Sequence, residues 1–182
     1  MDRLQSFIRI LSGRFDNAEQ LRALAAEGVT DFPQAEHVNT PCNDKIRGLP
    51  ADFSGVFLVE ESYYTVGGRT NASPHLFLFT EEGDAVKLTS YDLPDGKKDF
   101  TYASMQPVDY AALQPSAKFT PALFRLQDGV WSGGSESMFA PGLRFTLSER
   151  FSADALEVSE TMERDGKRIF GYDRPIVYRR KA

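Results

Sequence analysis

Cysteine, histidine and tryptophan are scarce in this sequence of 182 residues, which contains one Cys, two His and one Trp. The single cysteine, Cys42, excludes an intramolecular disulfide, which fits a reducing compartment. A closed zinc site would need nearly every Cys and His together with carboxylates, and none of them stand at the short spacing of metal ligands. We therefore expect no metal. A nucleophilic dyad of Cys42 with His37 or His75 stays open as an alternative.

Phosphate-binding and hydrolase motifs are missing as well. No Gly-rich loop ends in Gly-Lys-Ser/Thr, and no Gly-x-Ser-x-Gly elbow occurs. The usual sequence evidence for a hydrolase, a kinase or a nucleotide-dependent oxidoreductase is therefore missing. The 26 acidic residues outnumber the 21 basic ones, and the net charge is -5. Because this balance gives no overall positive field, we expect no nucleic-acid partner.

Long apolar runs are also absent. No stretch approaches the ~18 apolar residues that span a bilayer. The first residues, Met1, Asp2 and Arg3, include an early acid, and no apolar run of signal-peptide length follows them. We expect a soluble, cytoplasmic protein without a membrane partner. The sequence leaves its oligomeric state open.

Aromatic residues, by contrast, are plentiful. The 14 Phe and 7 Tyr help to bring the aromatic share to 12%, which is high for a disordered chain. A chain of 182 residues is long enough for one substantial core. Because it has no internal repeat and no linker-like tract, we predict a single domain that covers residues 1–182.

The N-terminal segment, residues 1–28, has helical periodicity. Leu4, Phe7, Ile8 and Leu11 fall on one helical stripe, with Asp2 as a plausible N-cap. A second helix is expected to begin at Asp16, which has capping-box spacing to Glu19, and to end at Gly28. We expect both helices to pack on or near the rest of the domain.

After residue 28 the pattern changes to short runs rich in Phe, Tyr, Val, Leu and Thr, separated by turn residues. We predict strands at 55–66, 74–80, 85–92, 122–127, 130–132, 143–151, 156–163 and 175–179, and a short helical connection at 109–113. About eight strands are typical of a barrel or sandwich. Apolar residues on both strand faces indicate either covering helices or an interior that lodges a ligand. The N-terminal helices would plug one barrel mouth.

Several segments, in order along the chain, resemble the chromophore lyases of the CpcT/CpeT type. They are 11–20 (LSGRFDNAEQ), 57–63 (FLVEESY), 130–133 (VWSG), 147–151 (LSERF) and Gly171 with 175–179. The evidence is their shared order and spacing over nearly the whole chain. Where the family has a Pro-Tyr-Arg motif, this chain has Pro74, His75 and Leu76, so Arg69 in the preceding loop is the candidate to replace the arginine.

The resemblance implies a mainly β fold, an antiparallel lipocalin-like (calycin) β-barrel with N-terminal helices. It also implies the function of the family, which is to bind a linear tetrapyrrole (bilin) in the barrel pocket and present it to a cysteine of a client phycobiliprotein. The C–S bond is formed without a metal or nucleotide. Apart from the bilin or another tetrapyrrole as substrate, we expect no cofactor.

Glu60 is the predicted catalytic residue. It shares a strand face with Leu58 and Tyr64, whereas Glu61 lies on the opposite face. Burial would raise the pKa of Glu60 and make it a proton donor or a partner for pyrrole N–H groups. The alternative is that Glu60 faces solvent and Glu61 points inward.

The predicted ligand-binding residues are aromatic or charged side chains near the expected pocket: Tyr63, Tyr64, Arg69, Tyr91, Trp131 and Glu149. Arg47, Arg125 and Arg144 are further candidates for binding ligand carboxylates. Each has an ordinary alternative: the tyrosines and Trp131 as core residues, the arginines as surface groups, and Glu149 as half of an internal ion pair.

Two other functions stay open. One alternative is a non-catalytic lipocalin-like binding protein for another small amphipathic ligand. An interaction protein would have its barrel filled by its own Phe and Trp side chains. Fold analogy alone does not choose among the three.

Overall fold

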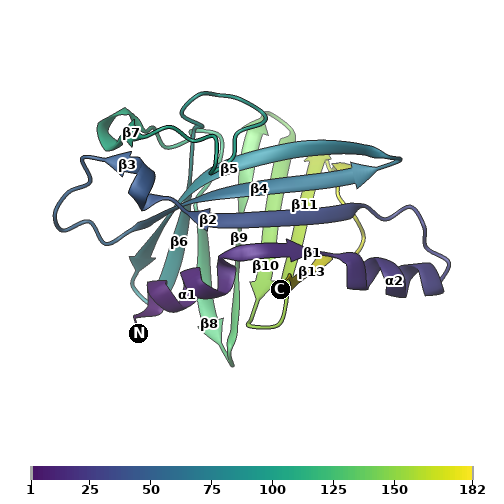
Figure 1. The fold of residues 1–182 in the computed structure, drawn as a ribbon. Coiled ribbons are helices and arrows are strands. Elements are labelled where there is room, and N and C mark those ends of the chain that lie inside the picture. Colours follow the sequence, from purple (N-terminus) through teal and green to yellow (C-terminus); the bar gives the residue numbers. More distant parts are fainter. Residues whose placement is uncertain (1, 182) are drawn as a thin grey trace.

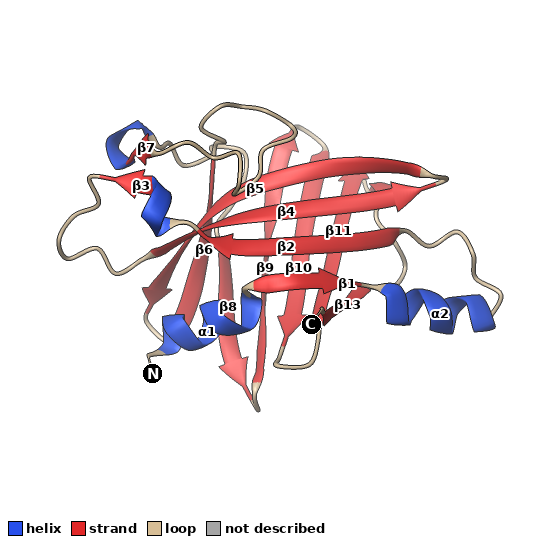
Figure 2. Ribbon diagram, viewed as in Figure 1, coloured by secondary structure: helices blue, strands red, loops and turns tan. Residues whose placement is uncertain are grey.

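Strand pairing closes the main sheet of this protein into an antiparallel barrel (Figures 1 and 2). The computed structural model describes residues 2–181. Within them, ten strands form the ring in the order β1-β2-β4-β5-β6-β8-β9-β10-β11-β13, and β13 pairs with β1. Their bounds are β1 Gly13–Asp16, β2 Gln34–Pro41, β4 Val56–Val66, β5 Arg69–Glu82, β6 Ala85–Tyr91, β8 Ala122–Gln127, β9 Val130–Ala140, β10 Leu143–Phe151, β11 Leu156–Arg164 and β13 Ile176–Arg180. The predicted antiparallel barrel is confirmed.

The remaining strands and the two 3₁₀ turns lie outside the ring. β12 (Lys167–Phe170) pairs with β11, and β3 (Ile46–Arg47) pairs with β7 (Val108–Asp109) in a small parallel sheet. Two 3₁₀ turns, η1 (Asn43–Lys45) and η2 (Tyr110–Ala112), adjoin that sheet, and η2 is the short helical connection predicted from the sequence. Across residues 2–181, no helix has the length and apolar character needed to cross a membrane.

All eight predicted strands are present in the ring, and the two that sequence patterns missed are β1 and β2. β1 has only four residues and lies inside the segment 1–28 that was expected to be helical, so that expectation is wrong for Gly13–Asp16. β2 lacks an apolar face, because its buried positions include His37 and Asn39. Both strands are nevertheless required to close the ring.

The first helix, α1 (Arg3–Leu11), closes one end of the barrel, so the prediction that the N-terminal helices plug a barrel mouth is correct for α1 and wrong for the second helix. Asp2 caps it by accepting a hydrogen bond from the Gln5 N–H at 2.7 Å. Its apolar stripe is buried, and the Phe7 ring packs against four interior aromatic rings at centroid distances of 4.9–5.4 Å: Phe79, Phe124, Trp131 and Phe151. Half of the barrel is therefore filled by a helix and a cluster of aromatic side chains.

The second helix, α2 (Ala18–Ala26), packs outside the ring against β13. Its N-cap is Asn17 and not the predicted Asp16, so no capping box forms with Glu19. The Asn17 side chain turns inward, where its amide donates to the Pro33 carbonyl and its oxygen accepts from the Ala35 N–H, each at 2.8 Å. These two bonds anchor the loop that leads into β2.

Apolar residues on the outer face of the barrel form a second core. Phe57, Val59, Leu76 and Leu78 point outward from β4 and β5 and are covered by the long connection between β6 and β8, which contributes Phe100 and Met105. The outward apolar face of these strands is thus covered by a loop and not by a helix.

Candidate functional site

The inward face of β4 changes from apolar to polar along its length. Val56 and Leu58 belong to the barrel core, whereas Glu60, Ser62 and Tyr64 continue the same face into the other half of the barrel. Antiparallel register places Glu60 between Asn39 of β2 and His75 of β5. The prediction that Glu60 and not Glu61 points inward is confirmed.

That half of the barrel is hollow. The cavity has a volume of about 440 Å³, within the range of roughly 300–1,000 Å³ that small-molecule sites occupy. Core residues Leu11, Phe79 and Leu88 line its closed end, and the half-exposed side chains of Val66 and Phe170 stand where it opens. The protein's own side chains therefore fill only one half of the barrel interior.

The wall of the cavity combines aromatic rings with titratable groups. Its aromatic residues are Tyr64, Phe77, Phe79, Phe119, Phe139, Phe145, Phe170 and Tyr172. Its charged or titratable residues, apart from tyrosine, are Glu60, His75, Lys118, Glu149 and Glu160. Three carboxyl groups thus share one aromatic-walled space.

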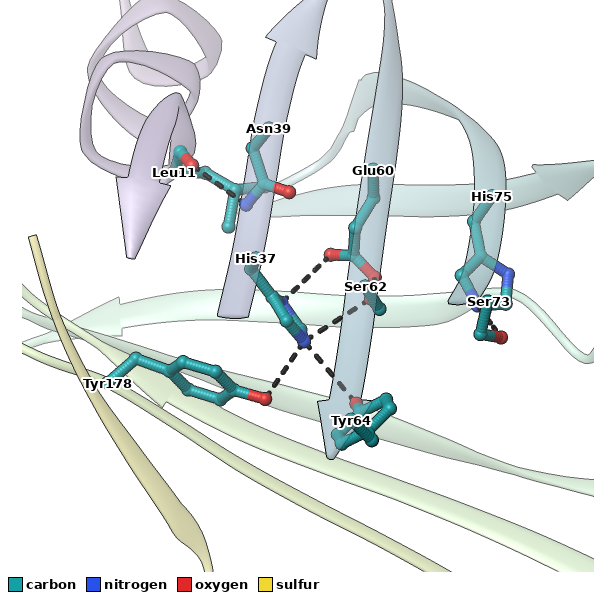
Figure 3. Close-up of polar contacts among 9 residues, drawn as sticks. All are labelled: Leu11, His37, Asn39, Glu60, Ser62, Tyr64, Ser73, His75 and Tyr178. Carbon is teal, nitrogen blue, oxygen red and sulfur yellow. Dashed lines mark hydrogen bonds and ion pairs between the residues drawn. The ribbon is translucent and has the colours of Figure 1, made fainter. Parts of the chain in front are cut away.

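Glu60 is paired with a buried histidine (Figure 3). His37 Nδ1 lies 3.5 Å from Glu60 Oε2, and His37 Nε2 lies 3.0 Å from the Tyr178 hydroxyl and 3.3 Å from those of Ser62 and Tyr64. Burial acts to raise the pKa of Glu60, but the charge and hydrogen bond of His37 outweigh it and lower the pKa to about 2. Glu60 is therefore ionised at neutral pH, and the expectation that its pKa is raised is wrong.

The other two carboxyl groups behave in the opposite way. Glu149 on β10 and Glu160 on β11 are diagonal neighbours, because Glu149 is opposite Val158 and Glu160 is opposite Leu147. Burial, followed by the negative charge of Glu60, raises the pKa of Glu149 well above its usual range and that of Glu160 to about 7. The cavity therefore combines one carboxyl group whose pKa is lowered with two whose pKa values are raised.

His75 forms part of the cavity wall. Its ring stacks on Phe77 with a centroid distance of 5.3 Å, and its Nε2 lies 3.2 Å from the Ser73 hydroxyl. Burial lowers its pKa more than the nearby Glu60 raises it, so His75 is neutral at pH 7. His75 is therefore a neutral, hydrogen-bonded residue of the cavity wall.

Of the predicted ligand-binding residues, Tyr64 and Glu149 line the cavity and the other four do not. Tyr63 alternates to the outer face of β4, where its hydroxyl donates to Glu61 at 2.8 Å. Tyr91 also faces outward and packs against Phe57 at 5.2 Å. Strand alternation therefore removes both tyrosines from the cavity.

Trp131 and Arg69 lie outside the cavity because of their positions along the length of the barrel. Trp131 points inward but lies in the filled half, where it is 1% exposed and contacts Phe7 at 5.0 Å. Arg69 is exposed at the β4–β5 hairpin, opposite Val66, and does not line the cavity. Trp131 is thus a core residue, and Arg69 does not supply an arginine to the site.

Sequence reasoning missed Glu160 and Lys118 as site residues and considered His37 only as a partner of Cys42, not of Glu60. The alternation of side chains along the strand could have identified Glu160, because it lies on the same inward face as Leu156 and Val158. His37 lies on a strand without an apolar face, and Lys118 lies in a connection between strands, so neither had a local signal.

One other site is a weaker candidate. An open groove of about 650 Å³ on the outer face of β2 and β4 contains Tyr63, but its charged groups already bind one another: Arg14 pairs with Glu36 at 2.7 Å, and Glu61 accepts from Tyr63. Within residues 2–181, no group of three or more His, Cys, Asp or Glu side chains is arranged to hold a metal ion.

Cys42 is separated from both histidines. It belongs to the outer core, whereas His37 and His75 face the barrel interior. Burial, reinforced by the charge of Asp44, raises the pKa of the Cys42 thiol to about 12. A Cys–His nucleophilic dyad is therefore not formed. Comparison with known proteins gives no match to any protein-family model or curated protein.

Proposed function

We propose that this protein is a lipocalin-like binding barrel for a flat, conjugated small molecule rich in N–H donors. The observation that carries the proposal is the convergence of Glu60, Glu149 and Glu160 on one aromatic-walled cavity. Buried carboxyl groups are costly unless they have partners, and here only Glu60 is matched by a buried histidine. A ligand that donates hydrogen bonds would supply the missing partners.

A linear tetrapyrrole, the ligand that the resemblance implies, fits this chemistry. Its rings stack on aromatic walls, and its pyrrole N–H groups donate to an ionised carboxylate such as Glu60. A protonated Glu149 would in turn donate to a terminal lactam carbonyl, because a carboxylic acid both donates and accepts. The open mouth allows a ligand longer than the cavity to extend beyond it.

The resemblance further supports a lyase step, in which the barrel presents the bilin to a client cysteine. The client thiol adds across an exocyclic double bond of the bilin: an S–C bond forms, and the adjacent ring carbon gains the proton. No group leaves and no oxidant is needed. Glu149, and not Glu60, is the better proton donor, because its pKa is raised while that of Glu60 is lowered. The thiol must come from another protein, since Cys42 is buried outside the cavity.

A non-catalytic binding protein is the second candidate. It is favoured by the placement of Arg69 outside the cavity, because the arginine of the family's motif then has no counterpart among the described residues that line it. The same cavity would then sequester a small amphipathic ligand without chemical change.

Binding is tested by titrating the purified protein with biliverdin or phycocyanobilin and recording the visible absorbance spectrum. We expect a spectral change that saturates at one bilin per protein and weakens about tenfold or more in Glu60→Gln, because a charged acceptor is lost. Glu61→Gln, on the outer face of the same strand, is the matched control and should bind like the wild type. An unchanged spectrum with both bilins would refute the proposal.

The lyase step is tested separately by adding a phycobiliprotein subunit with a free cysteine. Covalent transfer, detected by bilin fluorescence on a denaturing gel, should fall in Glu149→Gln while binding persists. Binding without transfer to any such subunit would favour the non-catalytic alternative.

A further inference from the structure

Charge is distributed unevenly along the cavity. The three carboxyl residues Glu60, Glu149 and Glu160 project from the barrel strands β4, β10 and β11. The one lysine of the lining, Lys118, belongs to the connection that precedes β8 and is exposed, which places it at the mouth. The cavity is therefore negative within and positive at its opening.

The arginines that the sequence suggested for ligand carboxylates are engaged elsewhere. Arg47 pairs with Asp109 at 3.0 Å, Arg125 with Asp84 at 3.3 Å, and Arg144 with Glu136 and Glu163. Among the described residues, no arginine lines the cavity. A ligand carboxylate in this site would therefore meet Lys118 as its cationic neighbour.

Lys118 is held at the mouth by aromatic rings and not by a carboxylate. Its ammonium lies 4.2 Å from the centroid of Phe139 and 5.4 Å from that of Phe119. These two rings pack edge to face at 5.2 Å, and both also contact Phe145. No Asp or Glu that the structure describes forms an ion pair with Lys118, so the ammonium keeps its donors for a ligand.

We propose that Lys118 determines ligand specificity by binding a carboxylate of the ligand at the cavity mouth. The inference rests on the proposed binding function and narrows it to ligands whose carboxylate lies on the side of the molecule away from their N–H donors. Contact with Phe119 and Phe139 limits the freedom of the lysine before the ligand arrives, which reduces the entropy lost on binding. The opposite charge within the cavity would orient such a ligand, because a carboxylate is repelled from Glu60.

The test compares biliverdin with biliverdin dimethyl ester, which keeps the conjugated rings and N–H groups but has no free carboxylate. We expect the wild type to bind the free acid about threefold to tenfold more tightly than the ester, a range that allows for solvent screening of an exposed lysine. In Lys118→Met the preference should disappear, through weaker binding of the acid with unchanged binding of the ester. Lys98→Met, at an exposed position on the connection that covers the outer face, is the control and should retain the preference.

The outcomes separate this inference from the function on which it rests. If both compounds bind wild type equally, or if Lys118→Met keeps the preference for the acid, Lys118 is not the specificity determinant while the binding function stands. If neither compound binds, the proposed function fails and this inference fails with it. Added salt gives a second readout, because it should weaken acid binding in the wild type more than in Lys118→Met.

Discussion

Replacing Glu160 by glutamine should stabilise the protein, and the gain should grow with pH. The pKa of Glu160 is raised from 4.5 to about 7, so the folded state holds this proton more tightly than the unfolded state does. Below pH 4.5 the group is protonated in both states and carries no penalty. Between pH 4.5 and about 7 the unfolded state loses the proton first, so wild-type stability falls as the pH rises.

The magnitude follows from the same comparison. Each pKa step is worth about 1.4 kcal/mol, so the full rise corresponds to at most about 3–4 kcal/mol above pH 7. Relaxation and water in the open cavity reduce this, and we expect Glu160→Gln to gain about 1–3 kcal/mol in free energy of unfolding at pH 8 relative to its effect at pH 5. The comparison between variants cancels the contributions of groups that both proteins share, such as His75.

The assay is urea unfolding at pH 5, 6, 7 and 8, followed by the fluorescence of Trp131, the single and fully buried tryptophan. Glu157→Gln, on the outward face of the same strand, reports the effect of an amide substitution away from the cavity. A difference between Glu160→Gln and wild type that stays flat or shrinks from pH 5 to pH 8 would refute the reasoning.

Three further predictions concern other parts of the barrel. Phe7→Ala should lower the free energy of unfolding by about 3–5 kcal/mol in urea unfolding, because it removes the ring that four interior aromatics contact; a loss below 1 kcal/mol would mean that α1 is not the closing element. His37→Leu should destabilise the protein by about 3–5 kcal/mol at pH 7 by leaving the buried Glu60 without its partner, and the loss should shrink in a Glu60→Gln background; full additivity of the two changes would contradict the pairing. Cys42 should resist a thiol reagent at pH 8 in native protein and react fully in urea, since it is buried and its pKa is raised to about 12; rapid reaction of native protein would disprove its placement.

Local sequence was sufficient to predict which side chains are buried wherever the periodicity of a strand or helix determines the face on which they lie. The two-residue period of β4 placed Glu60 and Tyr64 inward and Glu61 outward, and the helical stripe of α1 identified the buried face that closes the barrel. The Asp128-Gly129 and Asp165-Gly166 pairs, whose aspartates adopt positive φ angles of 51° and 50°, form the turns of the β8–β9 and β11–β12 hairpins, and Asp-Gly is a residue pair typical of such turns. In each case the information lies within a few residues of the chain.

Only the tertiary structure decided how the ring closes and what charge its interior carries. β1 and β2 have no apolar pattern that marks them as strands, and they are held in place by pairing with β4 and β13. The low pKa of Glu60 depends on His37, and the high pKa of Glu149 depends on burial and on Glu60, residues far apart in the chain. Electrostatic energies depend on burial and on distance through space, and sequence neighbours determine neither. The sequence therefore identified the carboxyl groups Glu60 and Glu149, whereas only the tertiary structure determined the directions of their pKa shifts.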